Sequence, residues 1–154
     1  MDTSRRNLGR SIGARDWLDE NAFKDKIKRA IRLKLDNNPE RLNELKLCNL
    51  PLTHYYVYND KIVRVPKADW IIDFLESIKS ENNLTRYKMK IFTPSTDGID
   101  HINIYSKGKT SLGRWLSNFA KSPIETEDGH FDSIEGYWYW YWLSSKDDTL
   151  RALS

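Results

Sequence analysis

Cysteine is almost absent from this chain of 154 residues, and its scarcity excludes two kinds of structure. The single Cys48 cannot form an internal disulfide, and it cannot supply a zinc site built from several cysteines. Cys48 is expected to be a small, buried apolar side chain. A chain without a disulfide framework fits a reducing compartment, so a cytoplasmic protein is expected.

Long apolar runs are also missing. No run approaches the roughly 20 residues that a membrane-spanning helix needs, and the opening Met-Asp-Thr-Ser-Arg-Arg lacks the apolar core of a signal peptide. We therefore expect no membrane association. With 39% hydrophobic and 31% charged residues, the chain is expected to fold as one globular domain over residues 1–154.

Several functional motifs are absent. The chain has no phosphate-binding Walker loop, no glycine fingerprint of a dinucleotide fold and no histidine-rich metal motif. Its three histidines, His54, His101 and His130, are far apart in sequence. We expect neither a metal nor a cofactor. The net charge of +3 tolerates a phosphate-bearing ligand but does not by itself indicate a nucleic-acid-binding protein.

An amphipathic helix is predicted from Glu20 to Leu35, with Asp19 as its N-cap. Its apolar side chains recur every three or four residues: Phe23, Ile27, Ala30, Ile31 and Leu35. The many basic residues of this segment, which include Lys34, are interpreted as a solvated face. A contact with nucleic acid is the alternative.

The rest of the chain predicts further helices and short strands. A second helix starts at Asn38-Pro39, and two β-prone runs around Asn59-Asp60 indicate a hairpin. Another helix, 68–79, is expected to bury Trp70, Ile71, Phe74, Leu75 and Ile78. Short strands are expected at 89–92 and 101–105. The fold class is therefore mainly α, of the α+β kind, with small β-hairpins.

The segment from Arg114 to Leu143 has the most distinctive composition. Ser133 is a good helix N-cap, and Glu135 then falls in the first helical turn, where the helix dipole favours a carboxylate. Trp138 and Tyr139 follow Glu135 at helical spacing. A carboxylate beside aromatic rings can hold a sugar or a base. The alternative is a capping glutamate on a helix of the aromatic core.

The sequence motifs of this segment are more specific than its composition. Trp-Leu-Ser-Asn-Phe at 115–119, Ser-Pro-Ile at 122–124, Asp-Gly at 128–129 and Phe-Asp-Ser-Ile-Glu-Gly-Tyr-Trp at 131–138 together resemble the NADAR family, also called YbiA-like. The resemblance implies a small, mostly helical domain acting on ADP-ribose-like N-glycosides. These include ADP-ribose attached to guanine, and phosphorylated intermediates of riboflavin synthesis.

The two halves of the family pattern occur in swapped order. Residues 1–80 resemble the family's C-terminal half, through Leu-Gly-Arg at 8–10 and Asn-Asn-Pro-Glu at 37–40. Residues 89–154 resemble its N-terminal half, and 81–88 would be a linker between fused native termini. We interpret the chain as a circular permutant, which is tolerated where native termini lie close together. Ser154 should then lie near Met1.

The resemblance implies N-glycosidase chemistry. Cleavage of an N-glycosidic bond passes through an oxocarbenium-like transition state, which a carboxylate can stabilise. Glu135 matches the family's glutamate, and Asn118 would hold a ribose hydroxyl or orient water. The expected substrate-binding residues are Trp115, Phe119, Tyr139, Arg6 and Arg10. Core packing is the alternative for Phe119, and a solvated basic helix end is the alternative for the two arginines.

Three departures from the family pattern bear on this expectation. The family's histidine is Gly136 here, its glutamine is Tyr139, and a lysine near the end of the same helix is Trp142. If that lysine forms a Schiff base, this chain must use another lysine, such as Lys109 or Lys121, or differ in activity. The alternatives to a hydrolase are a non-catalytic ADP-ribose-binding module and a basic nucleic-acid-binding domain.

Overall fold

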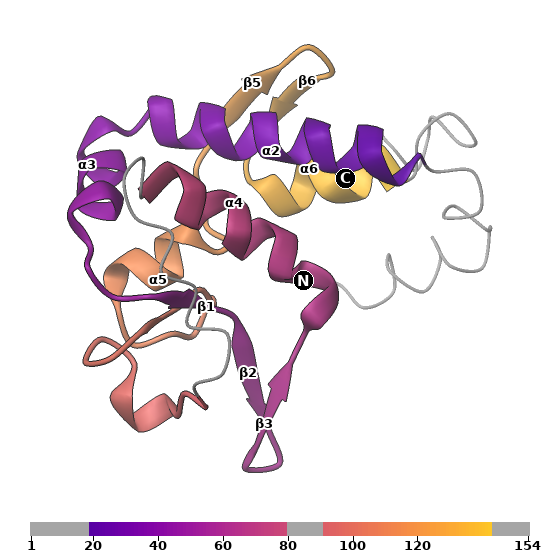
Figure 1. Cartoon of the computed structure of the whole chain (residues 1–154). Helices are drawn as coiled ribbons and strands as arrows, with labels where there is room; N and C mark the ends of the chain where they lie inside the picture. The colour runs from indigo at the N-terminus through magenta and orange to yellow at the C-terminus, as the bar shows by residue number, and fades with distance from the viewer. Residues whose placement is uncertain (1–18, 80–90, 143–154) are drawn as a thin grey trace. The chain divides into compact units, whose positions relative to one another are not determined.

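The computed structural model describes residues 19–79 and 91–142, which form helices and three two-stranded sheets (Figure 1). The expected α+β class is confirmed. The chain divides into two units. The end unit combines the chain up to Lys34 with the chain from Lys121 onward, and the central unit runs from Leu35 to Ala120.

The end unit contains the predicted amphipathic helix, α2 (Glu20–Asp36), except for its last two residues, which belong to the central unit. Asp19 caps it as expected, because the backbone N–H groups of Asn21 and Ala22 each donate to Asp19 Oδ1 at 3.0 Å. The other elements of this unit are β5 (Ile124–Thr126), β6 (Gly129–Phe131) and α6 (Ile134–Trp142). Strands β5 and β6 pair in an antiparallel hairpin.

Aromatic rings join α2 to α6 inside the end unit. The ring of Phe23 meets Trp138 edge-on at 4.6 Å between centroids and lies 5.6 Å from Tyr141. Such contacts stabilise a helix pair beyond the area they bury. The two helices run in opposite directions (Figure 1).

Lys34 is the clearest departure from the predicted pattern of α2. The expected solvated basic side chain is 2% exposed. Lys34 follows Ile31 by three residues and Ile27 by seven, so it continues the buried stripe. Removal from water lowers the pKa of its amine to about 7. The interpretation of Lys34 as part of a solvated face is therefore wrong.

The helices of the central unit are α3 (Pro39–Leu47), α4 (Asp69–Lys79) and α5 (Ser111–Leu116), with 3₁₀ turns η1 (Pro66–Ala68) and η2 (Pro94–Thr96). The predicted helices at Pro39 and at 68–79 are confirmed. Helix α4 buries Ile71, Leu75 and Ile78. Trp70 and Phe74, also expected to be buried, are only half-buried because they flank that stripe.

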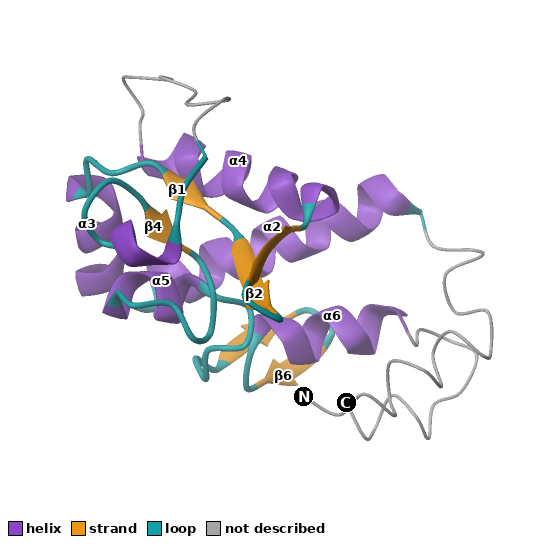
Figure 2. Ribbon diagram, turned by 90° about the horizontal axis from the view of Figure 1, so that it is seen from below, coloured by secondary structure: helices purple, strands orange, loops and turns teal. Residues whose placement is uncertain are grey.

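The predicted hairpin at Asn59-Asp60 is confirmed as β2 (Tyr55–Tyr58) and β3 (Lys61–Arg64). The β-prone segment that begins at Leu52 is interrupted at His54, whose Nδ1 lies 2.7 Å from the carbonyl oxygen of Ile104. Before this break, β1 (Leu52–Thr53) pairs in parallel with β4 (Ile102–Asn103), as Figure 2 shows.

Two other strand predictions have different outcomes. The strand expected at 101–105 shrinks to the two residues of β4, since a turn closed by Gly108 N–H donating to Tyr105 O follows. Of the strand expected at 89–92, Ile91 and Phe92 are not in a strand. Residues 89–90 and the proposed linker 81–88 lie outside the described residues. Within the described ranges, no helix combines the length and apolarity needed to cross a bilayer.

Candidate functional site

The first turn of α6 presents Glu135. Ser133 caps the helix, because Gly136 N–H donates to Ser133 Oγ at 3.1 Å. The cap fixes the position where the helix begins, so Glu135 lies in the first turn, half-buried. The positive end of the helix dipole favours the ionised carboxylate there. The predicted cap and the predicted place of Glu135 are both confirmed.

Aromatic side chains occupy the rest of α6 and the neighbouring strand. Phe131 from β6 lies 4.7 Å from Tyr137 and 5.6 Å from Trp140, measured between ring centroids. Tyr139, expected to bind substrate, is 8% exposed. A ring so covered presents little surface to a ligand. The side chain of Trp142 lies outside the described residues.

A second carboxylate of the end unit, Asp128, is held by two donors. Lys26 from α2 lies 2.9 Å from Asp128 Oδ2 and also contacts Glu127. The hydroxyl of Tyr137 donates to the same Oδ2 at 2.7 Å. These contacts tie the β5–β6 turn to both helices of the unit, which gives Asp128 a structural role.

The pKa values of the two donors follow from these contacts. The hydrogen bond to Glu127 is the largest cause of the raised pKa of Lys26. Burial, the next largest cause, lowers this pKa, and the contacts with Asp128 raise it. Burial, followed by the hydrogen bond to Asp128, raises the pKa of Tyr137 far above its ordinary value. Lys26 therefore stays charged and Tyr137 stays protonated at neutral pH, which keeps the Asp128 contacts intact.

In the central unit, the Ser-Asn-Phe motif forms a turn directly after α5. The backbone N–H of Ala120 donates to Ser117 O at 3.1 Å, and that of Phe119 donates to Ser117 Oγ at 3.4 Å. Asn118 is half-buried and Phe119 is 46% exposed. Core packing of Phe119 is therefore excluded, and its ring is open to a ligand.

Trp115 lies one turn before this motif, half-buried on α5. The guanidinium carbon of Arg41, from α3, is 5.9 Å from the centroid of its ring, within cation–π range. Arg41 also donates to Ser111 Oγ at 3.1 Å and to Glu44 at 2.7 Å. Sequence reasoning missed Arg41, because nothing in the local pattern brings α3 and α5 together.

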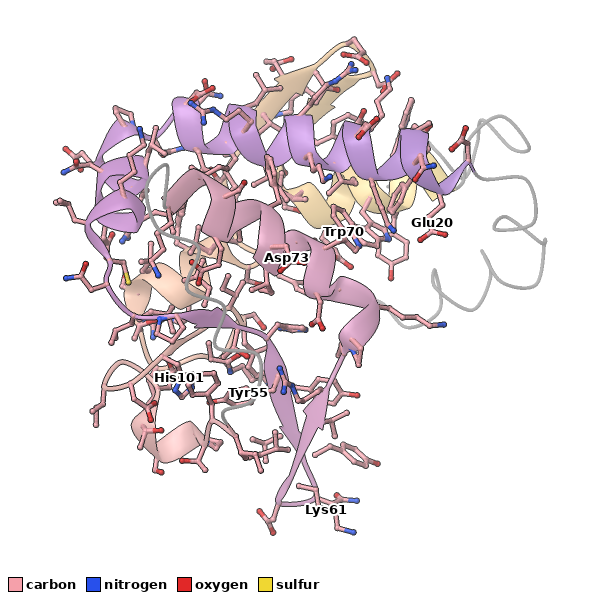
Figure 3. The ribbon with its side chains drawn as sticks, viewed as in Figure 1. Glu20, Tyr55, Lys61, Trp70, Asp73 and His101 are labelled. Atoms are coloured by element: carbon pink, nitrogen blue, oxygen red, sulfur yellow. The ribbon has the colours of Figure 1, made fainter. Side chains whose placement is uncertain are left out.

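A buried polar chain lies at the base of the β2–β3 hairpin. The Tyr55 hydroxyl is 2.7 Å from His101 Nε2, and His101 Nδ1 is 2.6 Å from Asp100 Oδ1 (Figure 3). Phe92 stacks on the imidazole at 4.5 Å. Burial, with the nearby Asp97 and Asp100 charges, raises the pKa of Tyr55 to about 12. His101 is 0% exposed, so this cluster holds the fold and does not face a substrate.

Asp97 organises the loop next to that chain. Its carboxylate accepts hydrogen bonds from the backbone N–H groups of Asn103, at 3.0 Å, and Lys109, at 2.8 Å. Lys109, considered as a substitute for the family's lysine, is exposed, and its Nζ donates to Ser95 O at 3.0 Å. The other considered lysine, Lys121, is exposed in the end unit.

The predicted site residues are therefore distributed over both units. Trp115, Asn118 and Phe119 belong to the central unit, while Glu135 and Tyr139 belong to the end unit. Arg6 and Arg10 lie outside the described residues, as do Met1 and Ser154. No cluster of three or more histidine, cysteine or acidic side chains suited to a metal occurs in the described ranges.

Comparisons with known proteins give no match. No protein-family model fits this chain, and neither a curated protein nor a solved structure is significantly similar to it.

Proposed function

We propose that this protein is an N-glycoside hydrolase of the NADAR kind. Its substrate would be ADP-ribose attached to a nucleobase, such as guanine in DNA or RNA, or a related ribosyl-phosphate N-glycoside. One observation carries the proposal. Glu135, at the position of the family's glutamate, is a half-buried carboxylate in the Ser133-capped first turn of α6.

The chemistry requires a negative charge beside the anomeric carbon. As the bond from C1′ to the base nitrogen breaks, its electron pair goes to the base, and positive charge develops on the ribose. Glu135 would stabilise that charge and take a proton from the water that adds to C1′. The helix N-terminus supports this role, because it favours the ionised carboxylate that a base requires.

The family resemblance also assigns binding contacts to the Ser-Asn-Phe turn of the central unit. Asn118 has an amide that both donates and accepts, so it can hold a ribose hydroxyl or orient water. The 46% exposure of the Phe119 ring supports stacking on a base. Trp115, whose ring centroid lies 5.9 Å from the Arg41 guanidinium carbon, is the second aromatic ring proposed to stack on a base.

The test is release of ADP-ribose from an oligonucleotide that carries ADP-ribosylated guanine, followed by chromatography. Glu135→Gln should slow release at least 1,000-fold, roughly 4 kcal/mol of lost transition-state stabilisation, while leaving substrate binding largely intact. Glu20→Gln makes the same change on a side chain that is 74% exposed, so it should retain the wild-type rate. Absence of release by the wild-type protein, or full activity of Glu135→Gln, would contradict the proposal.

A second candidate is a non-catalytic module that binds ADP-ribose. The observation that favours it is Trp142 at the position of the family's lysine. Calorimetry with ADP-ribose would then show saturable binding, while the modified oligonucleotide remains intact.

A further inference from the structure

The β2–β3 hairpin of the central unit forms an arm with a defined shape. Its register pairs Tyr56 with Val63 and Tyr58 with Lys61. Asn59 and Asp60 close it with φ of 48° and 57°, the paired positive values of a tight two-residue hairpin turn. Within its unit, the arm extends away from β1 and α4 and ends beside Lys61 (Figures 1 and 3).

The base of the arm is anchored. Tyr55 N–H donates to Asn103 Oδ1 and Asn103 Nδ2 donates to Tyr55 O, both at 3.1 Å. Tyr55 is 3% exposed, and its hydroxyl meets the buried His101. These contacts fix the start of β2, so the arm is held in place before any partner binds.

The outer part of the arm exposes aromatic and aliphatic side chains together with cations. Tyr58 is 66% exposed, Val57 47% and Ile62 38%. Lys61 and Arg64 are exposed, and neither has a carboxylate partner within the described part of the chain. Because side chains alternate along a strand, Tyr56, Tyr58 and Lys61 share one face, and Val57, Ile62 and Arg64 lie on the other.

We propose that this arm binds single-stranded nucleic acid on this face, with bases stacked on Tyr58 and Tyr56 and phosphates against Lys61. Aromatic rings interleaved with cations are the usual means of holding unpaired strands. Stacking on a tyrosine requires a base that is not stacked in a duplex, so single strands are favoured over double strands. Lys61 has no carboxylate partner among the described residues, and a phosphate would supply the complementary charge.

A second copy of the chain is the main competing occupant, since a two-stranded hairpin has open edges. Lys61 and Arg64 both lie on β3, and charged side chains on an edge strand oppose pairing with another edge. Lys61, which shares a face with Tyr58, also favours a polyanion.

Fluorescence anisotropy with an unmodified, end-labelled 20-nucleotide strand tests the proposal without any hydrolysis. The wild-type protein should bind at low salt, more tightly than it binds the matching duplex, and affinity should fall as salt rises. Tyr58→Ala and Lys61→Glu should each weaken binding about tenfold, whereas Tyr58→Phe, which retains the ring, should bind like the wild type. Glu135→Gln should bind normally, so loss of hydrolysis and loss of this contact are separable.

Lys46→Glu supplies the matched control, because Lys46 is an exposed lysine on α3 outside the arm. If Lys46→Glu weakens binding as much as Lys61→Glu does, binding depends on the overall positive charge of the protein. The assignment to the arm is then overturned. Absence of binding to any single strand at low salt overturns it too. So does a dimer, seen by sedimentation, that Tyr58→Ala dissociates while strand binding is unchanged.

Discussion

Lys34 is a residue whose amine is withdrawn from water. With 2% of its surface exposed, it has a pKa lowered by burial to about 7, against an ordinary value of 10.5. Between these two values, the unfolded chain binds a proton that the folded chain does not. The free energy of unfolding should therefore rise with pH from about 7 to 10.5, and this contribution should be constant below pH 7.

Replacing Lys34 with methionine tests this residue. Lys34→Met keeps most of the volume but removes the titrating group, so it should abolish a slope of up to about 1.4 kcal/mol per pH unit. It should also raise stability at pH 6. Urea unfolding at pH 6, 8 and 9.5 measures both effects, with the exposed Lys46→Met as the control. Equal slopes for Lys34→Met and the wild type would contradict the burial of a neutral amine.

The two carboxylates of the end unit differ because their surroundings differ. Asp128 is held by Lys26 and Tyr137 at 2.9 and 2.7 Å, whereas Glu135 lies at a helix start. From sequence, both belong to the same motif-rich segment. The contacts with Lys26 and Tyr137 give Asp128 a structural role, while the family motif makes Glu135 the proposed catalytic carboxylate.

At the scale of elements, α5 depends on a glycine. Thr110 Oγ1 caps the helix by accepting from Gly113 N–H at 3.0 Å. A Cβ at Gly113 would lie 2.4 Å from the backbone oxygen of Asn103 and 2.8 Å from Thr110 Oγ1. The close approach of α5 to β4 therefore requires a residue without a side chain.

Gly113→Ala should destabilise the protein by about 1–3 kcal/mol, since backbone atoms must move to admit the methyl group. The gain in helix propensity, about 1 kcal/mol for an exposed position, does not offset this clash. Thermal unfolding followed by circular dichroism measures the effect. An unchanged or higher midpoint would mean that α5 does not pack so closely on β4.

At the scale of the whole molecule, the swapped order of the family motifs remains a proposal. The end unit groups the first part of the described chain with the last. Phe23 from the first described helix and Tyr141 from the last lie 5.6 Å apart between ring centroids. Permutation requires Met1 and Ser154 to lie close together, because the chain would have been continuous there before the cut.

Rotating the chain tests the permutation. A chain that starts at Met89, runs through Ser154 directly into Asp2 and ends at Lys88 should fold with the same helix content and ADP-ribose release as the original order. If the permutation is right, Ser154 and Asp2 lie close together, and joining them should leave the free energy of unfolding equal or higher. Circular dichroism and denaturant unfolding measure this, and failure of the rotated chain to fold would contradict the permutation.

The sequence by itself determined the elements whose signals are local. The apolar spacing of Phe23, Ile27 and Ile31 predicts α2, and Asn59-Asp60 predicts the hairpin turn. Ser133 likewise fixes the start of α6 and hence the place of Glu135. These features depend on neighbours a few residues away, so the order of the residues is enough to predict them.

Tertiary structure alone decided which groups meet across long separations. It brings His101 to Tyr55, Arg41 to Trp115 and Lys26 to Asp128. It also buries Lys34, against the ordinary preference of its side chain. Such contacts depend on how separate helices and strands pack together. Packing depends on residues throughout the chain, so a local sequence pattern cannot predict it.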